Sequence, residues 1–259
     1  MKGRSPSSSI PKKRSSVDAR PRSRSQREPW EVARIVSELQ RLGSPRHLAG
    51  LAHFGIQSKI CYGIAQPKLD ALAKKIERSH ALALELWETG IYEARILAGM
   101  LDIPEEVTAK QMDAWVLDFD NWATCDGTCC HLFAFAAPAW EKAFAWTERQ
   151  EEFQKRAGFA LAAYLAYRDK SAADAEFVRF LKVIAREAGD TRNFVRKAVN
   201  WALRNIGKRN ARLNRAAIAT AARLLKSELP VTRWIAGDAL RELRGDAVQR
   251  RLRKRKEVR

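Results

Sequence analysis

The sequence has few cysteines, and their arrangement excludes a disulfide scaffold. Only four occur in 259 residues, and three of them, Cys125, Cys129 and Cys130, lie in one short segment. Secreted scaffolds space their cysteines along the chain, so a reducing compartment is expected. His131 follows directly and superficially completes a zinc set, but this spacing does not match the separated cysteine pairs of zinc sites. We therefore predict small buried thiols and no metal ion.

Long hydrophobic runs and cofactor-binding motifs are also missing. No apolar run approaches the roughly 20 residues that span a bilayer, and the N-terminus lacks the apolar stretch of a secretory signal. The motifs GxGxxG, GxxxxGK[ST] and HExxH do not occur. These absences predict a protein that needs no cofactor and has no membrane partner. We expect it in the cytoplasm, associated with the nucleoid if the source is bacterial.

Acidic residues are too few to balance the basic ones. The chain has 48 Lys and Arg against 30 Asp and Glu, a formal net charge of +18. Residues 1–28 hold a net +7 and residues 250–259 a net +6, so most of the excess lies at the two ends. Basic ends favour a polyanion, most often nucleic acid, over the alternative of solvated ends that aid solubility. We divide the chain into a disordered basic arm (1–28), one domain (29–247) and a basic C-terminal tail (248–259).

Glycine and proline are sparse after residue 28, and no period-2 strand pattern is convincing. The domain is predicted to be all-α, with short helices joined by brief polar turns. The expected helices are Glu31–Leu42, Pro45–Phe54, Gln66–Glu77, His80–Glu88, Ile91–Leu101, Thr108–Val116, Gly127–Phe135, Pro138–Trp146, Glu151–Tyr167, Ala173–Ala188, Asn193–Gly207, Asn210–Lys226 and Pro230–Leu243. Their spacing favours a curved solenoid of HEAT- or armadillo-like hairpins with a concave basic groove. The alternative is a compact, non-repeating helical bundle.

The segment 193–210 carries the clearest sign of a recognition surface. On a helix, Val195, Ala198, Val199, Ala202 and Ile206 form one apolar side. The opposite side carries Lys197, Trp201, Arg204 and Lys208. A tryptophan among cations on a face expected to be wet indicates recognition more often than packing.

Two further segments contain residues that could carry chemistry. Trp122 and Asp126 are four positions apart and share a face in a helical turn, where a ring and a carboxylate could hold a cation. In the alternative, Trp122 is a core residue and Asp126 caps a helix beginning at Gly127. Arg156 flanks the apolar stripe of its predicted helix, so its guanidinium could reach a phosphate or carboxylate from the edge, or form a structural ion pair.

In chain order, these segments resemble the AlkD-type DNA alkylation repair glycosylases, a HEAT-like repeat family. The resemblance covers about residues 30–245. It rests on YGIAQPKLDALAKKI from Tyr62, YEARILAGML from Tyr92, DNWATCD from Asp120, FQKRAGFAL from Phe153 and FVRKAVNWALRNIGKRN from Phe194. One departure is Ala123, where relatives usually carry an acidic residue.

The resemblance implies that Asp126 and Trp122 are the active-site carboxylate and aromatic residue. It also implies that Arg156 contacts the DNA backbone and that Trp201 is the second aromatic residue, with Lys197, Arg204 and Lys208 holding phosphates. A purine alkylated at N3 or N7 is already cationic and leaves without a proton donor, so one carboxylate can stabilise the oxocarbenium-like sugar. The expected partner is duplex DNA, bound by a monomer. The alternatives are a non-catalytic repeat protein that binds DNA or RNA by shape, and a protein-binding scaffold.

Overall fold

The computed structural model describes residues 30–56 and 58–257. The predicted basic arm (1–28) lies outside this part of the chain. The described residues form α1 (Val32–Leu42), α2 (Pro45–His53), α3 (Gln66–Ala73), α4 (His80–Glu88), α5 (Tyr92–Leu101), α6 (Ala109–Leu117), α7 (Trp122–His131), η1 (Phe133–Phe135), α8 (Ala139–Trp146), α9 (Glu152–Arg168), α10 (Asp174–Glu187), α11 (Asn193–Gly207), α12 (Ala211–Leu224), α13 (Pro230–Arg244) and α14 (Asp246–Glu257). The described residues contain no strand, only an isolated bridge between Ile60 and Ile91.

The all-α prediction is confirmed, and all thirteen predicted helices are present. One boundary was wrong in a way that matters for the site, because α7 begins at Trp122 rather than at Gly127 and ends at His131. The chain then makes a short 3-10 turn at Phe133–Phe135. The segment predicted as a C-terminal tail forms α14, which packs its Val248 and Leu252 side chains into buried positions.

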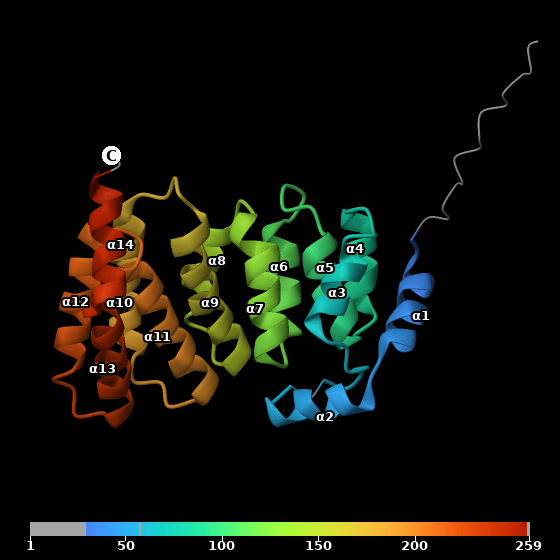
Figure 1. Cartoon of the computed structure of the whole chain (residues 1–259), viewed down its shortest axis with the longest axis horizontal. Coiled ribbons are helices and arrows are strands. Elements are labelled where there is room, and N and C mark those ends of the chain that lie inside the picture. The colour runs from blue at the N-terminus through green and yellow to red at the C-terminus, as the bar shows by residue number, and fades with distance from the viewer. Residues whose placement is uncertain (1–29, 57, 258–259) are drawn as a thin grey trace, which may run out of the picture.

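The helices form a stack of antiparallel pairs (Figure 1). Consecutive helices contact each other in the pairs α4–α5, α8–α9, α10–α11 and α12–α13. The second helices of successive pairs, α5, α7, α9, α11 and α13, also contact their neighbours in that order and make one continuous layer. Each repeat therefore buries its apolar side against the next, which is how helical solenoids build their core.

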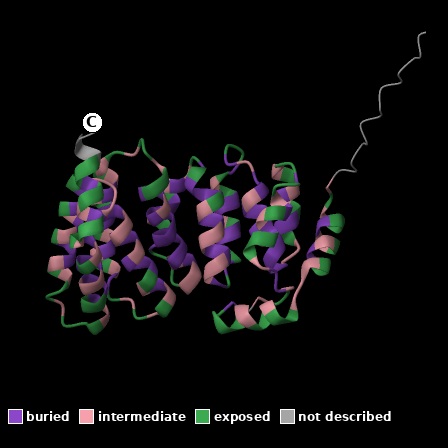
Figure 2. Cartoon of the chain, in the orientation of Figure 1, coloured by how far each residue is buried: buried purple, intermediate pink, exposed green. Residues whose placement is uncertain are grey.

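The core runs along the stack, as the buried residues in Figure 2 indicate. At its centre Trp87 and Trp115 stack with ring centroids 3.9 Å apart. Helix α9 contributes a nearly continuous buried run from Arg156 to Ala163. By contrast, α2 has no buried residue and lies across the ends of other helices rather than within the stack (Figure 1). None of the helices in the described ranges combines the length and the apolar composition that a membrane crossing requires.

Candidate active site

The N-terminus of α7 sets the position of Trp122 and Asp126. Asn121 caps this helix, and its side-chain oxygen accepts hydrogen bonds from the backbone N–H groups of Ala123 and Thr124, both at 2.9 Å. An Asn at the N-cap satisfies donors that have no partner within the helix. Asp126 lies in the second turn and is not a cap, so that alternative was wrong. Trp122 and Asp126 are therefore one turn apart on the same helix.

Asp126 forms a two-pronged ion pair with Arg156 of α9. Its two carboxylate oxygens accept from Nε of Arg156 at 2.8 Å and from a terminal guanidinium nitrogen at 2.6 Å. The other terminal nitrogen donates to the backbone carbonyl of Phe194, at the start of α11, at 2.7 Å. Arg156 is buried rather than reaching out from an edge as predicted. One guanidinium thus joins α7, α9 and α11 at the carboxylate.

Two effects act in opposite directions on the pKa of Asp126. Burial raises the pKa of the Asp126 carboxyl above its ordinary value, while the positive charge and hydrogen bonds of Arg156 act to lower it. Fork geometry, with each carboxylate oxygen accepting from a separate nitrogen, fits the ionised carboxylate. The Asp126 side chain keeps 16% of its surface exposed, so its charge is partly accessible from solvent.

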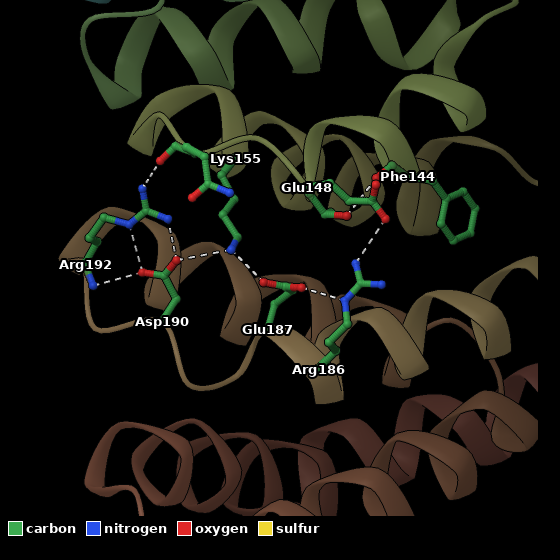
Figure 3. Close-up of polar contacts among 9 residues, drawn as sticks. Phe144, Glu148, Lys155, Arg186, Glu187, Asp190 and Arg192 are labelled. Atoms are coloured by element: carbon green, nitrogen blue, oxygen red, sulfur yellow. Dashed lines mark hydrogen bonds and ion pairs between the residues drawn. The ribbon is translucent and has the colours of Figure 1, made fainter.

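Lys155 points away from the candidate site, although it is adjacent to Arg156. Its ammonium lies 2.6 Å from Glu187 and 3.4 Å from Asp190, which in turn bind Arg186 and Arg192 (Figure 3). This network ties the start of α9 to the end of α10 and to the loop before α11. Of the two neighbouring cations, it is therefore Arg156 that faces Asp126.

Trp201 of α11 is half-buried and packs edge-on against Tyr164 of α9, with ring centroids 4.9 Å apart. Burial raises the pKa of Tyr164, and the negative charge of Asp126 adds to this shift. Tyr164 therefore packs against Trp201, and the charge of Asp126 is one cause of its raised pKa. Helical spacing places Tyr164 on the apolar stripe of α9 and does not show these contacts, because its partners lie on other helices.

The predicted basic side of α11 is only partly free. Arg204 and Lys208 each bind a carboxylate oxygen of Glu242 on α13 at 2.7 Å. Lys197 is exposed. Part of the face opposite the apolar side is therefore covered, because α13 packs beside α11. The apolar side itself is confirmed, since Val195, Ala198, Val199, Ala202 and Ile206 are all buried.

Helix α2 reaches the site through its C-terminal end. The indole N–H of Trp122 donates to the backbone carbonyl of Phe54 at 3.0 Å. The Phe54 ring is 66% exposed, which makes it the most exposed large hydrophobic side chain of the described residues. Gly55 approaches the ring of Phe194 so closely that an added Cβ would lie 3.4 Å from it. The end of α2 therefore lies between Trp122 and the start of α11.

A buried carboxylate holds the loop that carries α2 to α3. Glu93 accepts hydrogen bonds from the backbone N–H groups of Tyr62, Gly63 and Ile64, at 3.1, 2.8 and 3.2 Å. Gly63 has a φ of +74°, a conformation that favours glycine. Glu93 is fully buried, so its role is to position this loop rather than to meet a ligand.

The cysteine-rich segment belongs to α7, the helix that also carries Trp122 and Asp126. Cys125 and Cys129 are buried, and their thiols contact the backbone carbonyls of Phe153 and Ala157. In the part of the chain that the structure describes, no three His, Cys, Asp or Glu side chains group in a way that could hold a metal ion.

The arrangement supplies an oriented carboxylate, paired with Arg156 and one helical turn from Trp122. Such a site stabilises a positive charge that develops on a bound group, because the carboxylate is already oriented and partly shielded from water. Trp122 and Trp201 come from two different helices, α7 and α11.

Comparisons with known proteins give a family match and a similar fold. The family model described as DNA alkylation repair enzyme matches residues 35–243. One similar solved structure is described as "a new family of proteins related to the HEAT-like repeat DNA glycosylases with affinity for branched DNA structures". It has a TM-score of 0.68 and 20% sequence identity, and the match covers 81% of this chain and 94% of that one. No curated protein matches the sequence.

Proposed function

The chain belongs to the DNA alkylation repair enzyme family, and on this premise we propose that it is a DNA glycosylase. Its substrate is a cationic purine, alkylated at N3 or N7, in duplex DNA. The observation that carries the proposal is the Asp126 carboxylate, which is oriented by Arg156 and lies one turn from Trp122. Both tryptophans of the site would lie against the deoxyribose and the backbone around the lesion.

The reaction breaks the bond between C1′ and the purine nitrogen. The bonding electrons move to the cationic purine, which leaves as a neutral base and needs no proton donor. The sugar becomes oxocarbenium-like, and the Asp126 carboxylate stabilises this positive charge electrostatically. Water then bonds to C1′ and loses a proton, for which Asp126 is a suitable first acceptor. One carboxylate suffices because the leaving group is already activated.

Arg156 would connect DNA binding to the charge of the carboxylate. In the free protein its guanidinium compensates Asp126 with two hydrogen bonds. A backbone phosphate near the lesion would compete for the same N–H groups. Transfer of one hydrogen bond to the phosphate would leave Asp126 less compensated when substrate is bound. Lys197, which is exposed on α11, is a further candidate for phosphate contact.

The test is release of N7-methylguanine from a duplex that contains one such base. We expect Asp126→Asn to slow single-turnover release by at least about 100-fold, because Asn keeps the shape but not the charge. Duplex affinity should change little. Asp238→Asn is a matched control, since Asp238 is an ion-paired carboxylate on α13. Equal loss of release and of binding in Asp126→Asn would contradict a catalytic carboxylate.

A second candidate function is non-catalytic recognition of DNA shape. It is favoured by the complete engagement of Asp126 by Arg156, which is also what a purely structural ion pair would look like. The similar solved structure belongs to proteins described as having affinity for branched DNA. Under this function, a four-way junction would bind more tightly than a duplex, and no alkylated base would be released from either.

A further inference from the structure

A large basic cleft lies at the other end of α9 and α11 from Asp126. It has a volume of about 1370 Å³ and is bounded by the C-terminal ends of these two helices, the N-terminal ends of α10 and α12, and α14. Tyr167 of the cleft follows Arg156 by 11 residues on α9, a separation of about 16 Å along a helix. The cleft is therefore separate from Asp126, although Lys208 of α11 borders it, and the distance is short enough to be spanned by a few nucleotides.

Five exposed cations line the cleft, one of them Lys170 in the loop after α9 and the other four on two helices. Arg212 and Arg215 come from the first turns of α12, and Arg251 and Lys254 come from α14. Asp174 is the one carboxylate among the lining residues; it accepts a hydrogen bond from Asn210 at 2.8 Å and lies 4.0 Å from the guanidinium of Arg212. The lining thus carries a positive excess suited to several phosphate groups. Helix α14 begins after residue 243, where the match to the family model ends.

An exposed aromatic side chain distinguishes this cleft from a simple phosphate site. Tyr167 lines it with 64% of its surface exposed. The Lys170 ammonium lies 5.0 Å from the centroid of the Tyr167 ring. Beside the cleft, the guanidinium carbon of Arg168 lies 5.6 Å from the centroid of Tyr167 and 5.1 Å from that of Phe135, which is half-exposed. Exposed rings interleaved with cations are typical of surfaces on which unpaired bases stack. Bases within a duplex already stack on each other, so their faces are not available.

We propose that this cleft is a second nucleic-acid site, which binds a single DNA strand. Phosphates occupy the cationic lining from α12 and α14, and bases stack on Tyr167 and its neighbours. This function goes beyond base release and does not depend on Asp126. It gives the protein a means to hold an unpaired segment, such as a gap, a flap or the displaced strand at a junction.

The test is binding of a fluorescein-labelled 20-nucleotide DNA strand without alkylated bases, followed by anisotropy at several salt concentrations. We expect Tyr167→Ala to weaken binding at least about fivefold, from the loss of one base–aromatic stack. The double variant Arg212→Ala/Arg215→Ala should make the slope of log K against log salt shallower by about 1.4, since each single-strand phosphate contributes about 0.7.

A matched control lies at the other end of the same helix, at Arg223 within α12 and Lys226 just after it. Arg223→Ala/Lys226→Ala removes the same charge at the opposite end of α12, from two exposed positions outside the cleft. Retained binding in this control, with loss in the cleft variants, supports the proposal. Equal losses in both double variants would mean general charge attraction and would overturn it. So would a Tyr167→Ala variant with unchanged affinity, or an unlabelled duplex that competes as well as the single strand.

The outcome is separable from the proposed glycosylase activity. Asp126→Asn should bind the single strand as the parent does, whether or not the parent releases N7-methylguanine. Absence of base release with single-strand binding through the cleft would remove the proposed function and leave this site standing. The reverse result would remove the site alone.

Discussion

The guanidinium of Arg156 decides how much negative charge Asp126 presents to a ligand. Burial on its own disfavours the ionised carboxylate, and Arg156 is the positive group that opposes this effect. Because the proposed reaction needs the ionised form, base release should rise with pH through the pKa of Asp126. Burial raises that pKa above the ordinary carboxyl value. As the pH is lowered, activity should therefore be lost at a higher pH than it would be with an exposed carboxyl group.

Substitution of Arg156 tests this coupling. In Arg156→Ala the opposing charge is lost and the pKa of Asp126 rises further, so we expect base release at neutral pH to fall by at least about tenfold. Raising the pH should restore part of the rate. Arg156→Lys keeps the charge and loses the fork, so its loss should be smaller. Single-turnover rates between about pH 5 and pH 9 measure the effect. Losses of rate that are equal in the two variants and independent of pH would contradict the coupling between Arg156 and the pKa of Asp126.

Individual site residues were predictable only where local spacing decides their placement. The four-residue separation of Trp122 and Asp126 put both on one helical face, as the structure has them. Local spacing could not show that Asn121 rather than Asp126 is the cap. Nor could it show that Arg156 and not Lys155 meets the carboxylate, because the partners lie 30 and 32 residues away. Tyr164 and Phe194 were missed for the same reason.

At the scale of elements, the fit of α8 against α9 depends on one glycine. A Cβ at Gly158 would lie 2.7 Å from the backbone nitrogen of Thr147 and 2.9 Å from the carbonyl oxygen of Ala143. These atoms belong to backbone and cannot rotate away. We expect Gly158→Ala to lower the free energy of unfolding by about 1–3 kcal/mol through overpacking.

Gly237, within α13, is the control for this substitution. An added Cβ there would meet nothing within 4 Å. Gly237→Ala should therefore raise the free energy of unfolding by about 0.5–1 kcal/mol, since alanine favours the helix. Urea unfolding of both variants gives the comparison. A stabilising Gly158→Ala would show that α8 and α9 separate more readily than their close contact indicates.

The charged network that joins α9, α10 and the loop before α11 should make stability depend on pH (Figure 3). Burial acts to raise the pKa of Glu187 and Asp190, but hydrogen bonds from Lys155, Arg186 and Arg192 hold both pKa values below the ordinary 4.5 and 3.8. Their stabilisation is therefore complete above these ordinary values. It is lost as the pH falls through the lower pKa values of the folded state.

A variant without these charges tests the network. Glu187→Gln/Asp190→Asn should lower the free energy of unfolding at neutral pH by roughly 1–3 kcal/mol, from lost charge-assisted hydrogen bonds. Its stability should approach that of the parent at low pH, where the parent carboxyls are protonated. Glu38→Gln is the control, because the Glu38–Arg41 pair lies on the surface of α1 and should contribute little. Parallel stability curves for parent and variant would contradict the argument.

At the scale of the whole molecule, helical periodicity was enough to predict the stack of helices. The exceptions are elements whose position is set by distant contacts. Helix α2 leaves the stack because Glu93 holds the following loop and Trp122 binds its last turn. Helix α14 was not predicted because its sequence is dominated by cations. Only Val248 and Leu252 give it buried apolar contacts.

The uneven distribution of charge predicts how the whole chain binds DNA. Residues 1–28 carry a net +7, while the cations of α11 are partly neutralised by Glu242. A basic arm adds counterion release without contacting the reacting atoms. Deletion of residues 2–28 should therefore weaken duplex binding and make the slope of log K against log salt shallower by at least about 1, since each phosphate contact contributes about 0.9.

The rate of base release at saturating DNA separates this effect from catalysis. It should change less than about twofold on deletion, because the proposed catalytic carboxylate and its Arg156 partner lie in the described domain. A second variant, with the nine Lys and Arg of residues 1–28 replaced by Gln, keeps the length and removes the charge. If charge is the cause, it should reproduce the deletion in both slope and affinity. An unchanged slope in both variants would mean that these cations remain solvated in the complex and that the domain alone supplies the phosphate contacts.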